Sequence, residues 1–267
     1  MPRLTWRRCA RALFTLLTFS ICLAGCAGWR PAKVPMDSMF SFAAPDSVGA
    51  RRAPALLVML PGAYDTPRDF IEHGFVAAVR DRRLDVDIQL VDAHVGYYTG
   101  QTILERLQQD VIEPARRQGY RQIWLAGISI GGMGSLAYTA THPADIAGVV
   151  ALAPYLGPRN ISADVVRAGG LRSWPDESQW LPEDDMDRRL WLWLKSRTLS
   201  PPPEGLPLLY WGYGLADRFA QGHKAVAEAL PADKVFTVEG GHDWPAWISL
   251  WHQVLDKLPW QHTGGAP

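Results

Sequence analysis

Short apolar runs alternate along this chain with longer stretches bounded by helix start and stop signals. The runs predict strands at residues 55–60, 87–93, 122–128, 146–153, 206–212 and 234–239. Helices are predicted from Thr66 onward and at residues 102–118, 131–142 and 245–258. This alternation predicts an α/β fold, in which a mostly parallel central sheet carries helices on both faces. The parallel strands would all end at one edge, where the connecting loops converge.

Two segments depart from the alternation. Before residue 55 there is room for one strand, near residues 39–43, so the N-terminal part of the sheet looks abbreviated. Residues 158–205 contain no strand pattern and end in a proline run, which predicts a helical cap inserted over the sheet edge. The tryptophans of this insertion either pack the cap onto the core or suggest an apolar or aromatic substrate group. They are Trp174, Trp180, Trp191 and Trp193.

The N-terminus has the pattern of an export signal. Four arginines within residues 3–11 precede an apolar stretch at residues 12–23. That stretch is shorter than the roughly 20 residues that a membrane span needs. The sequence Leu-Ala-Gly-Cys at residues 23–26 resembles the bacterial lipobox, which implies cleavage before Cys26 and lipidation of this residue. A plain secretory signal and an uncleaved anchor are the alternatives.

The lipobox resemblance divides the chain into a signal peptide at residues 1–25, a tether at residues 26–37 and an α/β domain at residues 38–260. The other two cysteines lie in the signal and would leave with it, so no disulfide could form within the mature chain. These features predict an exported lipoprotein, anchored to a membrane through the lipid on Cys26, in the bacterial periplasm or at the cell surface.

The composition is that of a globular protein, with 48% hydrophobic and 20% charged residues among 267. The formal net charge is zero, but the signal contains arginines and no acidic residue, so the remaining chain is slightly acidic. This balance gives no electrostatic reason to expect nucleic-acid binding.

The strongest chemical signal is the G-x-S-x-G pattern that ends the strand at residues 122–128. It reads Gly127-Ile128-Ser129-Ile130-Gly131 and lies where a strand should turn into a helix. In a nucleophile elbow the serine occupies a strained turn that exposes its Oγ, and glycines two residues away allow the chain to turn tightly. We therefore expect Ser129 to be a nucleophile.

Two later strands each precede a side chain that serine attack requires. His242 follows the strand at residues 234–239, behind two glycines that let a loop bring the imidazole over Ser129. Asp217 follows the strand at residues 206–212 and could orient that imidazole. The order of serine, aspartate and histidine is the one expected of this architecture. Competing acids are the neighbouring Asp243 and three residues of the cap, Asp184, Asp185 and Asp187.

The tetrahedral oxyanion of such a reaction needs two hydrogen-bond donors. One is expected to be the N–H of Ile130, directly after the serine, and the other the N–H of Ala63 in the loop after residues 55–60. Gly62 would let that loop pass close to the substrate. Tyr64 could add its hydroxyl as a donor or pack under the cap.

The remaining histidines are weaker candidates. His94 ends a predicted strand, where it could contact substrate or serve the structure, while His73, His142, His223 and His252 lie on predicted helices without spaced partners. The chain contains no H-E-x-x-H, C-x-x-C or G-x-x-x-x-G-K-[ST] motif, so nothing in it indicates a metal or nucleotide site. The serine chemistry needs no cofactor.

With elbow, acid and histidine each after the expected strand, residues 55–258 resemble an α/β-hydrolase. The stretch from His242 to Trp247 resembles the H-x-W-x-x-W ending of the esterase branch that includes esterase D and feruloyl or acetyl esterases. Trp244 of this motif joins Tyr64 and His94 as a candidate substrate contact. Pro61 departs from the family pattern, because many relatives have histidine before the glycine of the oxyanion loop.

Together, these features predict a serine hydrolase that cleaves the carboxylic ester of a small molecule through an acyl-enzyme. An acyltransferase or a thioesterase would use the same triad. The alternative from another class is a non-catalytic, surface-binding lipoprotein that has kept the fold.

Overall fold

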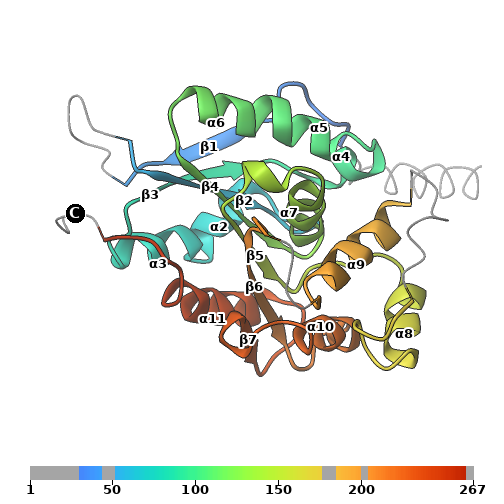
Figure 1. Ribbon diagram of the computed structural model, residues 1–267. Coiled ribbons are helices and arrows are strands. Elements are labelled where there is room, and N and C mark those ends of the chain that lie inside the picture. The colour runs from blue at the N-terminus through green and yellow to red at the C-terminus, as the bar shows by residue number, and fades with distance from the viewer. Residues whose placement is uncertain (1–29, 44–51, 176–184, 200–203, 263–267) are drawn as a thin grey trace, which may run out of the picture. The chain divides into compact units, whose positions relative to one another are not determined.

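The computed structural model describes residues 30–43, 52–175, 185–199 and 204–262 (Figure 1). The chain divides into two units, residues 1–31 and 32–267, and every element below belongs to the second. The expected signal peptide and Cys26 lie outside the described residues, as do Trp180 and Asp184 of the expected cap. Within the described part, no helix is long and apolar enough to span a bilayer.

A sheet of seven strands, ordered β1-β3-β2-β4-β5-β6-β7, forms the centre of the described fold. The first strand pairs antiparallel with β3, and all other neighbours pair in parallel. The strands are β1 (Ser38–Ser41), β2 (Ala55–Leu60), β3 (Val86–Val91), β4 (Gln122–Ile128), β5 (Gly148–Leu152), β6 (Leu208–Gly214) and β7 (Val235–Val238). The predicted α/β class, with its mostly parallel sheet and single extra N-terminal strand, is confirmed.

Helices cover both faces of this sheet (Figure 1). They are α2 (Pro67–Glu72), α3 (Phe75–Asp81), α4 (Val95–Thr99), α5 (Ile103–Arg106), α6 (Glu113–Arg117), α7 (Ile130–Thr141), α8 (Arg159–Arg167), α9 (Met186–Ser196), α10 (Ala220–Ala227) and α11 (Trp244–Leu255). Shorter or wider turns are the π-helix η1 (Leu107–Ile112) and the 3₁₀ helices η2 (Pro143–Asp145) and η4 (Ala232–Lys234).

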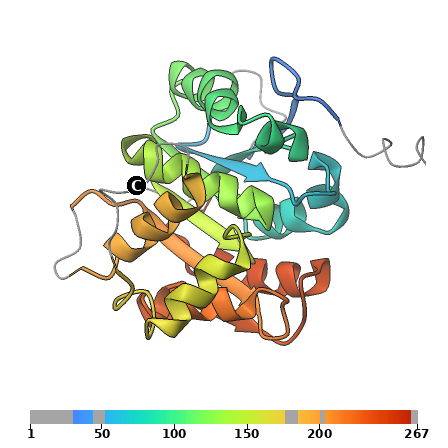
Figure 2. The same cartoon turned by 90° about the vertical axis from the view of Figure 1, so that its right-hand side faces the viewer.

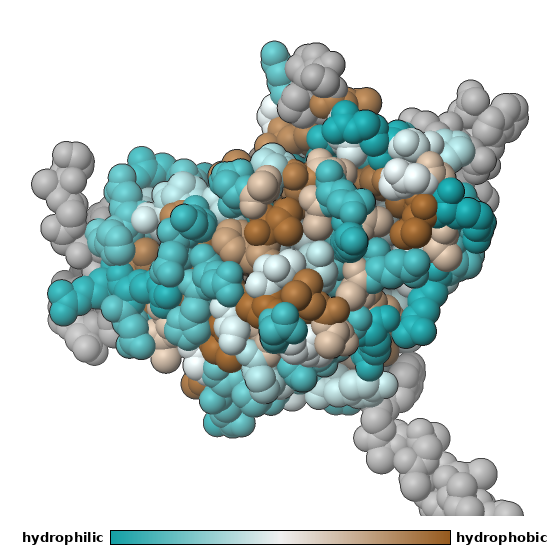
Figure 3. All heavy atoms as spheres, turned by 90° about the horizontal axis from the view of Figure 1, so that it is seen from below, coloured by the Kyte–Doolittle hydropathy of each residue, from teal (hydrophilic) through white to brown (hydrophobic). Residues whose placement is uncertain are grey.

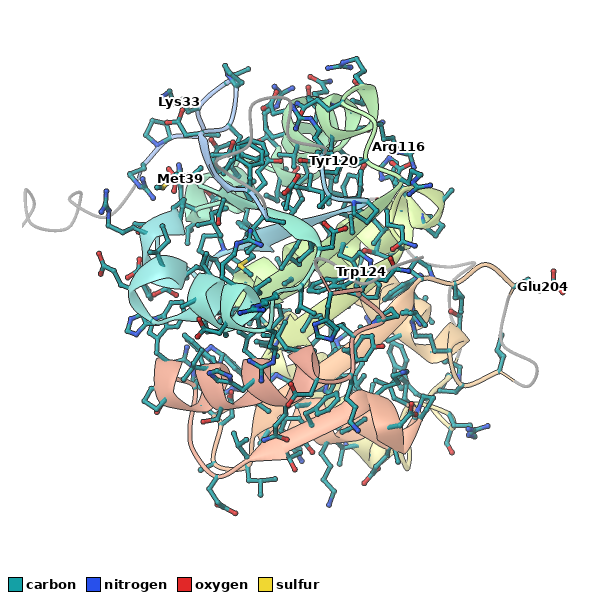
Figure 4. All side chains as sticks on the ribbon, turned by 90° about the vertical axis from the view of Figure 1, so that its left-hand side faces the viewer. Lys33, Met39, Arg116, Tyr120, Trp124 and Glu204 are labelled. Carbon is teal, nitrogen blue, oxygen red and sulfur yellow. The ribbon has the colours of Figure 1, made fainter. Side chains whose placement is uncertain are left out.

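Each face of the sheet carries its own buried cluster, because successive side chains of a strand point to opposite faces. On β2, Leu56 and Val58 belong to the cluster that includes residues of η1 and of α4 to α10, whereas Leu57 and Met59 belong to the cluster that includes residues of α2, α3 and α11. Trp124 of β4 belongs to the second cluster, where its ring meets the edge of Trp260 at 5.5 Å between centroids. Figure 4 shows Trp124 inside the molecule and Lys33 and Glu204 at its periphery.

The structure corrects several predicted boundaries. The helix expected from Thr66 is divided at Gly74, whose φ of 81° places it in the left-handed region and starts α3. The helix expected at residues 102–118 contains the π-helical turn η1 between α5 and α6. The strands expected at residues 146–153 and 206–212 run from 148 to 152 and from 208 to 214 instead.

The insertion at residues 158–205 contributes α8 and α9 to the described structure. Helix α9 packs beside α7, and α8 beside α10 (Figure 2). Trp191 is fully buried, and its indole N–H donates to the carbonyl of Leu156 at 2.8 Å. Trp174 is also buried and meets Trp191 edge-on. These two tryptophans therefore pack the insertion onto the core.

The surface over α10, α11 and β7 is mixed in character. Hydrophilic residues cover most of this face, and hydrophobic residues gather in small groups between them (Figure 3). Such scattered apolar residues are ordinary on a protein surface.

Candidate active site

Ser129 lies at a sharp turn between the last residue of β4 and the first residue of α7. Its φ of 54° and ψ of −117° are strained for a residue with a side chain. The turn is also tightly packed, since a Cβ on Gly131 would lie 2.2 Å from the carbonyl oxygen of Leu60. The backbone therefore has the strained strand-to-helix geometry of a nucleophile elbow.

Two loops at the same sheet edge bring His242 and Asp217 together. Asp217 follows β6 and His242 follows β7, and β6 and β7 are parallel neighbours. The loops are joined by a backbone hydrogen bond of 2.9 Å from the Ala216 N–H to the carbonyl of Gly240. The backbone pairing of the two strands thus continues into the loops that follow them, and it holds the side chains of Asp217 and His242 close together.

The three side chains form one hydrogen-bonded series. His242 Nε2 lies 2.9 Å from Ser129 Oγ, and His242 Nδ1 lies 2.7 Å from Asp217 Oδ2. Ser129 is 9% exposed and Asp217 6% exposed, so little water competes for these bonds. A carboxylate accepts from Nδ1–H, which leaves Nε2 as an acceptor for the serine hydroxyl.

The environment of Asp217 keeps its carboxylate ionised. Burial raises the pKa of Asp217, but hydrogen bonds from His242 and from the Phe219 N–H, with the nearby imidazoles of His242 and His223, bring it below its usual range. The Phe219 N–H donates to Oδ1 at 2.8 Å while His242 occupies Oδ2. The rings of Phe219 and Trp247 meet the imidazole edge-on, with centroids 5.3 and 5.2 Å away. These contacts leave the imidazole little freedom to rotate.

The segments that carry the expected oxyanion donors both lie next to the serine. Ile130 is the first residue of α7, so its N–H has no acceptor within the helix. In the loop after β2, a Cβ on Gly62 would lie 3.9 Å from Ser129 Cβ, which places this loop beside the serine. Ala63 is the next residue of that loop. The side chain of Tyr64 is 98% exposed, so the alternative of packing under the cap is wrong.

Trp244 and His94 have clear structural contacts. The Trp244 indole N–H donates to Asp65 Oδ1 at 3.2 Å, and its ring stacks on His73 at 4.2 Å. Trp244 therefore supports the loop that carries Ala63. His94 is 6% exposed and caps α4, because its Nδ1 accepts from the Gly96 N–H at 3.1 Å.

The competing acids have other positions. Asp243 caps α11 by accepting from the Ala246 N–H, and Asp185 caps α9 by accepting from the Arg188 N–H. The carboxylate of Asp187 lies against the backbone of Gly157. Among the described residues, no group of three or more histidines, cysteines and acids is arranged to hold a metal ion.

His223 was not among the residues that sequence reasoning selected for the site. It is fully buried, and its Nε2 lies 2.8 Å from the carbonyl oxygen of Pro154. Burial lowers the pKa of His223, so the ring is neutral and Nε2–H is the donor. The next residue, Tyr155, donates its N–H to the carbonyl of Ser129 at 2.8 Å. His223 thus anchors the segment that holds the elbow, and no sequence motif marks this role.

Comparison with known proteins gives the family. A search of curated proteins finds no match. Among solved structures, S-formylglutathione hydrolase from Staphylococcus aureus is similar at a TM-score of 0.55 and 12% identity, covering 86% of this chain and 98% of that one. Est1E from Butyrivibrio proteoclasticus is similar at a TM-score of 0.53 and 14% identity, covering 83% and 92%. A ferulic acid esterase is similar at a TM-score of 0.52 and 17% identity, covering 78% and 85%.

These structural likenesses show an α/β-hydrolase fold. The family model described as "Putative esterase" matches residues 97–258, which include Ser129, Asp217 and His242. Since this match spans more than half of the chain, the protein belongs to the "Putative esterase" family.

Proposed function

We propose that this protein is a serine hydrolase that cleaves carboxylic esters of small molecules. The observation that carries the proposal is the continuous hydrogen-bonded series from Ser129 through His242 to Asp217. A strained elbow, a histidine base and a buried acid are the three components that nucleophilic serine catalysis requires. They come from three segments far apart in the sequence, which a chance turn would not bring together.

In the proposed mechanism, Ser129 Oγ attacks the acyl carbon while its proton passes to His242 Nε2. Asp217 holds the imidazole in the correct tautomer and stabilises the imidazolium that forms. The N–H groups of Ile130 and Ala63 donate to the oxyanion of the tetrahedral intermediate. His242 then returns the proton to the leaving alcohol. In the second half of the reaction, His242 takes a proton from water, which attacks the acyl-enzyme, and then returns that proton to Ser129 Oγ as the acid is released.

The relatives support a substrate that is an acyl ester or thioester. Two of the similar structures are an S-formylglutathione hydrolase and a ferulic acid esterase, and a further structure shows ferulic acid bound to Est1E. Another is a fluorophosphonate-binding serine hydrolase from Staphylococcus aureus, similar at 14% identity. From these proteins we extend two properties to the present chain: catalysis by a serine hydrolase and a small ester as the substrate.

A fluorophosphonate probe tests the proposal directly. We expect stoichiometric labelling of the folded protein, with the phosphonyl group on the peptide that contains Ser129, because the probe needs an activated serine. We also expect turnover of short acyl esters in a panel graded by chain length. A folded protein that resists labelling and hydrolyses none of the panel would support the non-catalytic alternative.

We further propose that the enzyme is an exported lipoprotein anchored through Cys26. The proposal rests on the arginine-rich start, the apolar stretch and the lipobox-like residues 23–26. Mass spectrometry of the mature N-terminus is expected to show a chain that begins at Cys26 and carries lipid. Replacing Cys26 by serine should release the protein from membranes, and an unmodified Cys26 in the wild type would contradict the proposal.

A further inference from the structure

A cavity of about 510 Å³ lies between α4, the start of α5, the middle of α7 and the start of α9. This volume is large enough for a small organic group. Its walls are mostly apolar and include Leu104, Met133 and Leu190. Its polar lining residues are Tyr98 on α4, Gln101 shortly after α4, and Asp185 and Asp187 at the start of α9.

Backbone hydrogen bonds to the elbow hold two parts of the cavity wall close to Ser129. Met133 donates its N–H to the carbonyl of Ser129 at 3.1 Å, so the cavity wall begins one turn along α7 from the serine. On the other side, Tyr155 bonds to the same carbonyl, and the loop continues to Gly157. A Cβ on Gly157 would lie 2.7 Å from Asp187 Cγ, so the carboxylate rests directly on this loop.

The Asp187 carboxylate has no counter-ion in the described structure. It makes no hydrogen bond or ion pair with any described residue, whereas its neighbour Asp185 caps α9 and lies 3.9 Å from Arg188. Burial raises the pKa of Asp187, and the charge of Asp185 raises it further. A half-buried carboxylate in an apolar cavity is costly unless a positive group pairs with it.

A second polar group of the cavity also lacks a partner. The Tyr98 hydroxyl is fully buried and bonds to no other described residue. It lies over Gly134 of α7, where a Cβ would come within 2.5 Å of the hydroxyl oxygen. Buried polar groups are normally satisfied, so an unpartnered hydroxyl and an unpaired carboxylate in one cavity point to a ligand that supplies the missing contacts.

We propose that this cavity is the specificity pocket of the enzyme and that it takes a substrate group with an ammonium charge on an apolar stem. Asp187 is the counter-ion of the ammonium, Met133 and Leu190 contact the stem, and Tyr98 offers its hydroxyl oxygen beside the charge. An anionic group would be repelled, and a neutral group would leave the carboxylate unpaired. This inference rests on the proposed function and names the substrate class of the same site.

A pair of isosteric acetate esters tests the pocket. One carries a 2-(trimethylammonio)ethyl group and the other the uncharged 3,3-dimethylbutyl group, so the two differ in charge and hardly in shape. We expect the wild-type kcat/KM to favour the charged ester by about tenfold or more. Asp187→Asn should remove this preference through a higher KM for the charged ester, whose ammonium loses its counter-ion.

Asp164→Asn is the matched control. Asp164 is another carboxylate of the cap, on α8, where it pairs with Arg167 at 2.9 Å and with Arg188 at 3.8 Å and does not line the cavity. The same change of charge at this position should leave the preference intact. The proposal is overturned if the wild type does not prefer the charged ester, or if Asp187→Asn lowers the turnover of both esters equally.

Binding separates this inference from the proposed function. Titration calorimetry with butyltrimethylammonium measures occupancy of the pocket without turnover, and Asp187→Asn is expected to weaken this binding about tenfold or more. If the protein binds this cation through Asp187 but hydrolyses no ester, the proposed function is refuted and the proposed pocket is supported. If the protein hydrolyses the neutral ester but does not bind the cation, the proposed pocket is refuted and the proposed function is supported.

Discussion

Ser129→Ala is expected to lower kcat/KM for short acyl esters by about 10⁴-fold or more, because the variant has no atom that can form the acyl-enzyme. Alanine keeps the Cβ, so the strain of the elbow and its packing on Leu60 are unchanged. The lost hydroxyl contacts His242 Nε2, and the bond from His242 to Asp217 remains. Initial rates and fluorophosphonate labelling measure the effect.

Ser135→Ala is the matched control for this experiment. Ser135 is a fully buried serine on the same helix, and its hydroxyl donates to the carbonyl of Gly131 at 2.8 Å. This variant also loses one hydroxyl near the elbow, but it keeps the proposed nucleophile and should keep labelling and most activity. Turnover that survives Ser129→Ala undiminished, in a protein with a wild-type melting temperature, would contradict the assignment of the nucleophile.

Asp217→Asn is expected to lower kcat by about 10³- to 10⁴-fold, because it forces the wrong tautomer on the histidine. The carbonyl oxygen of the asparagine would keep the bond from the Phe219 N–H, which turns its amide N–H₂ toward His242 Nδ1. Nδ1 must then accept this hydrogen bond, so the ring proton moves to Nε2. A protonated Nε2 cannot take the proton of the serine hydroxyl. Steady-state kinetics at neutral pH measure the loss.

Asp243→Asn tests the competing acid beside the histidine. Asp243 caps α11 through the Ala246 N–H, and asparagine caps a helix about as well as aspartate. This variant should therefore keep both stability and activity. An equal loss of activity in the two variants would contradict the role proposed for Asp217.

The same aspartate has a predictable effect on acid stability. Its pKa is lower in the folded protein than its ordinary value of 3.8. Its ionised form therefore stabilises the fold above that ordinary value, and the contribution is lost as the pH falls through the lower folded pKa. In denaturant titrations, the difference in unfolding free energy between wild type and Asp217→Asn should shrink in this acidic range. A difference that grows with acidity would show that the folded pKa is raised instead.

Much of the fold was predictable because its strands are short, buried and separated by clear helix signals. The strand at residues 122–128 has the predicted boundaries, since the apolar run stops at the elbow. The division of the first helix at Gly74 and the π-helical turn η1 were not predictable in this way. Both depend on how the helices meet the sheet, which apolar spacing does not record.

The site shows the same limit. Strand order along the chain made Ser129, Asp217 and His242 candidates for one edge, and the structure brings them within hydrogen-bonding distance. His223 has no motif, because its role depends on reaching a carbonyl 69 residues away. The position of Tyr64 could not be inferred either, since the same loop sequence is compatible with an exposed or a covered tip.

The sequence by itself determined the elbow, the order of acid and base, and the strand and helix pattern that brings them to one edge. These features depend on local chain chemistry and on the handedness of parallel crossovers, both of which are written in residue type and spacing. The tertiary structure alone decided which acid reaches His242, and that Asp187 lies in a mostly apolar cavity near the elbow with no counter-ion among the described residues. Burial and the lack of a partner depend on every segment packed around a residue, so no local pattern contains them.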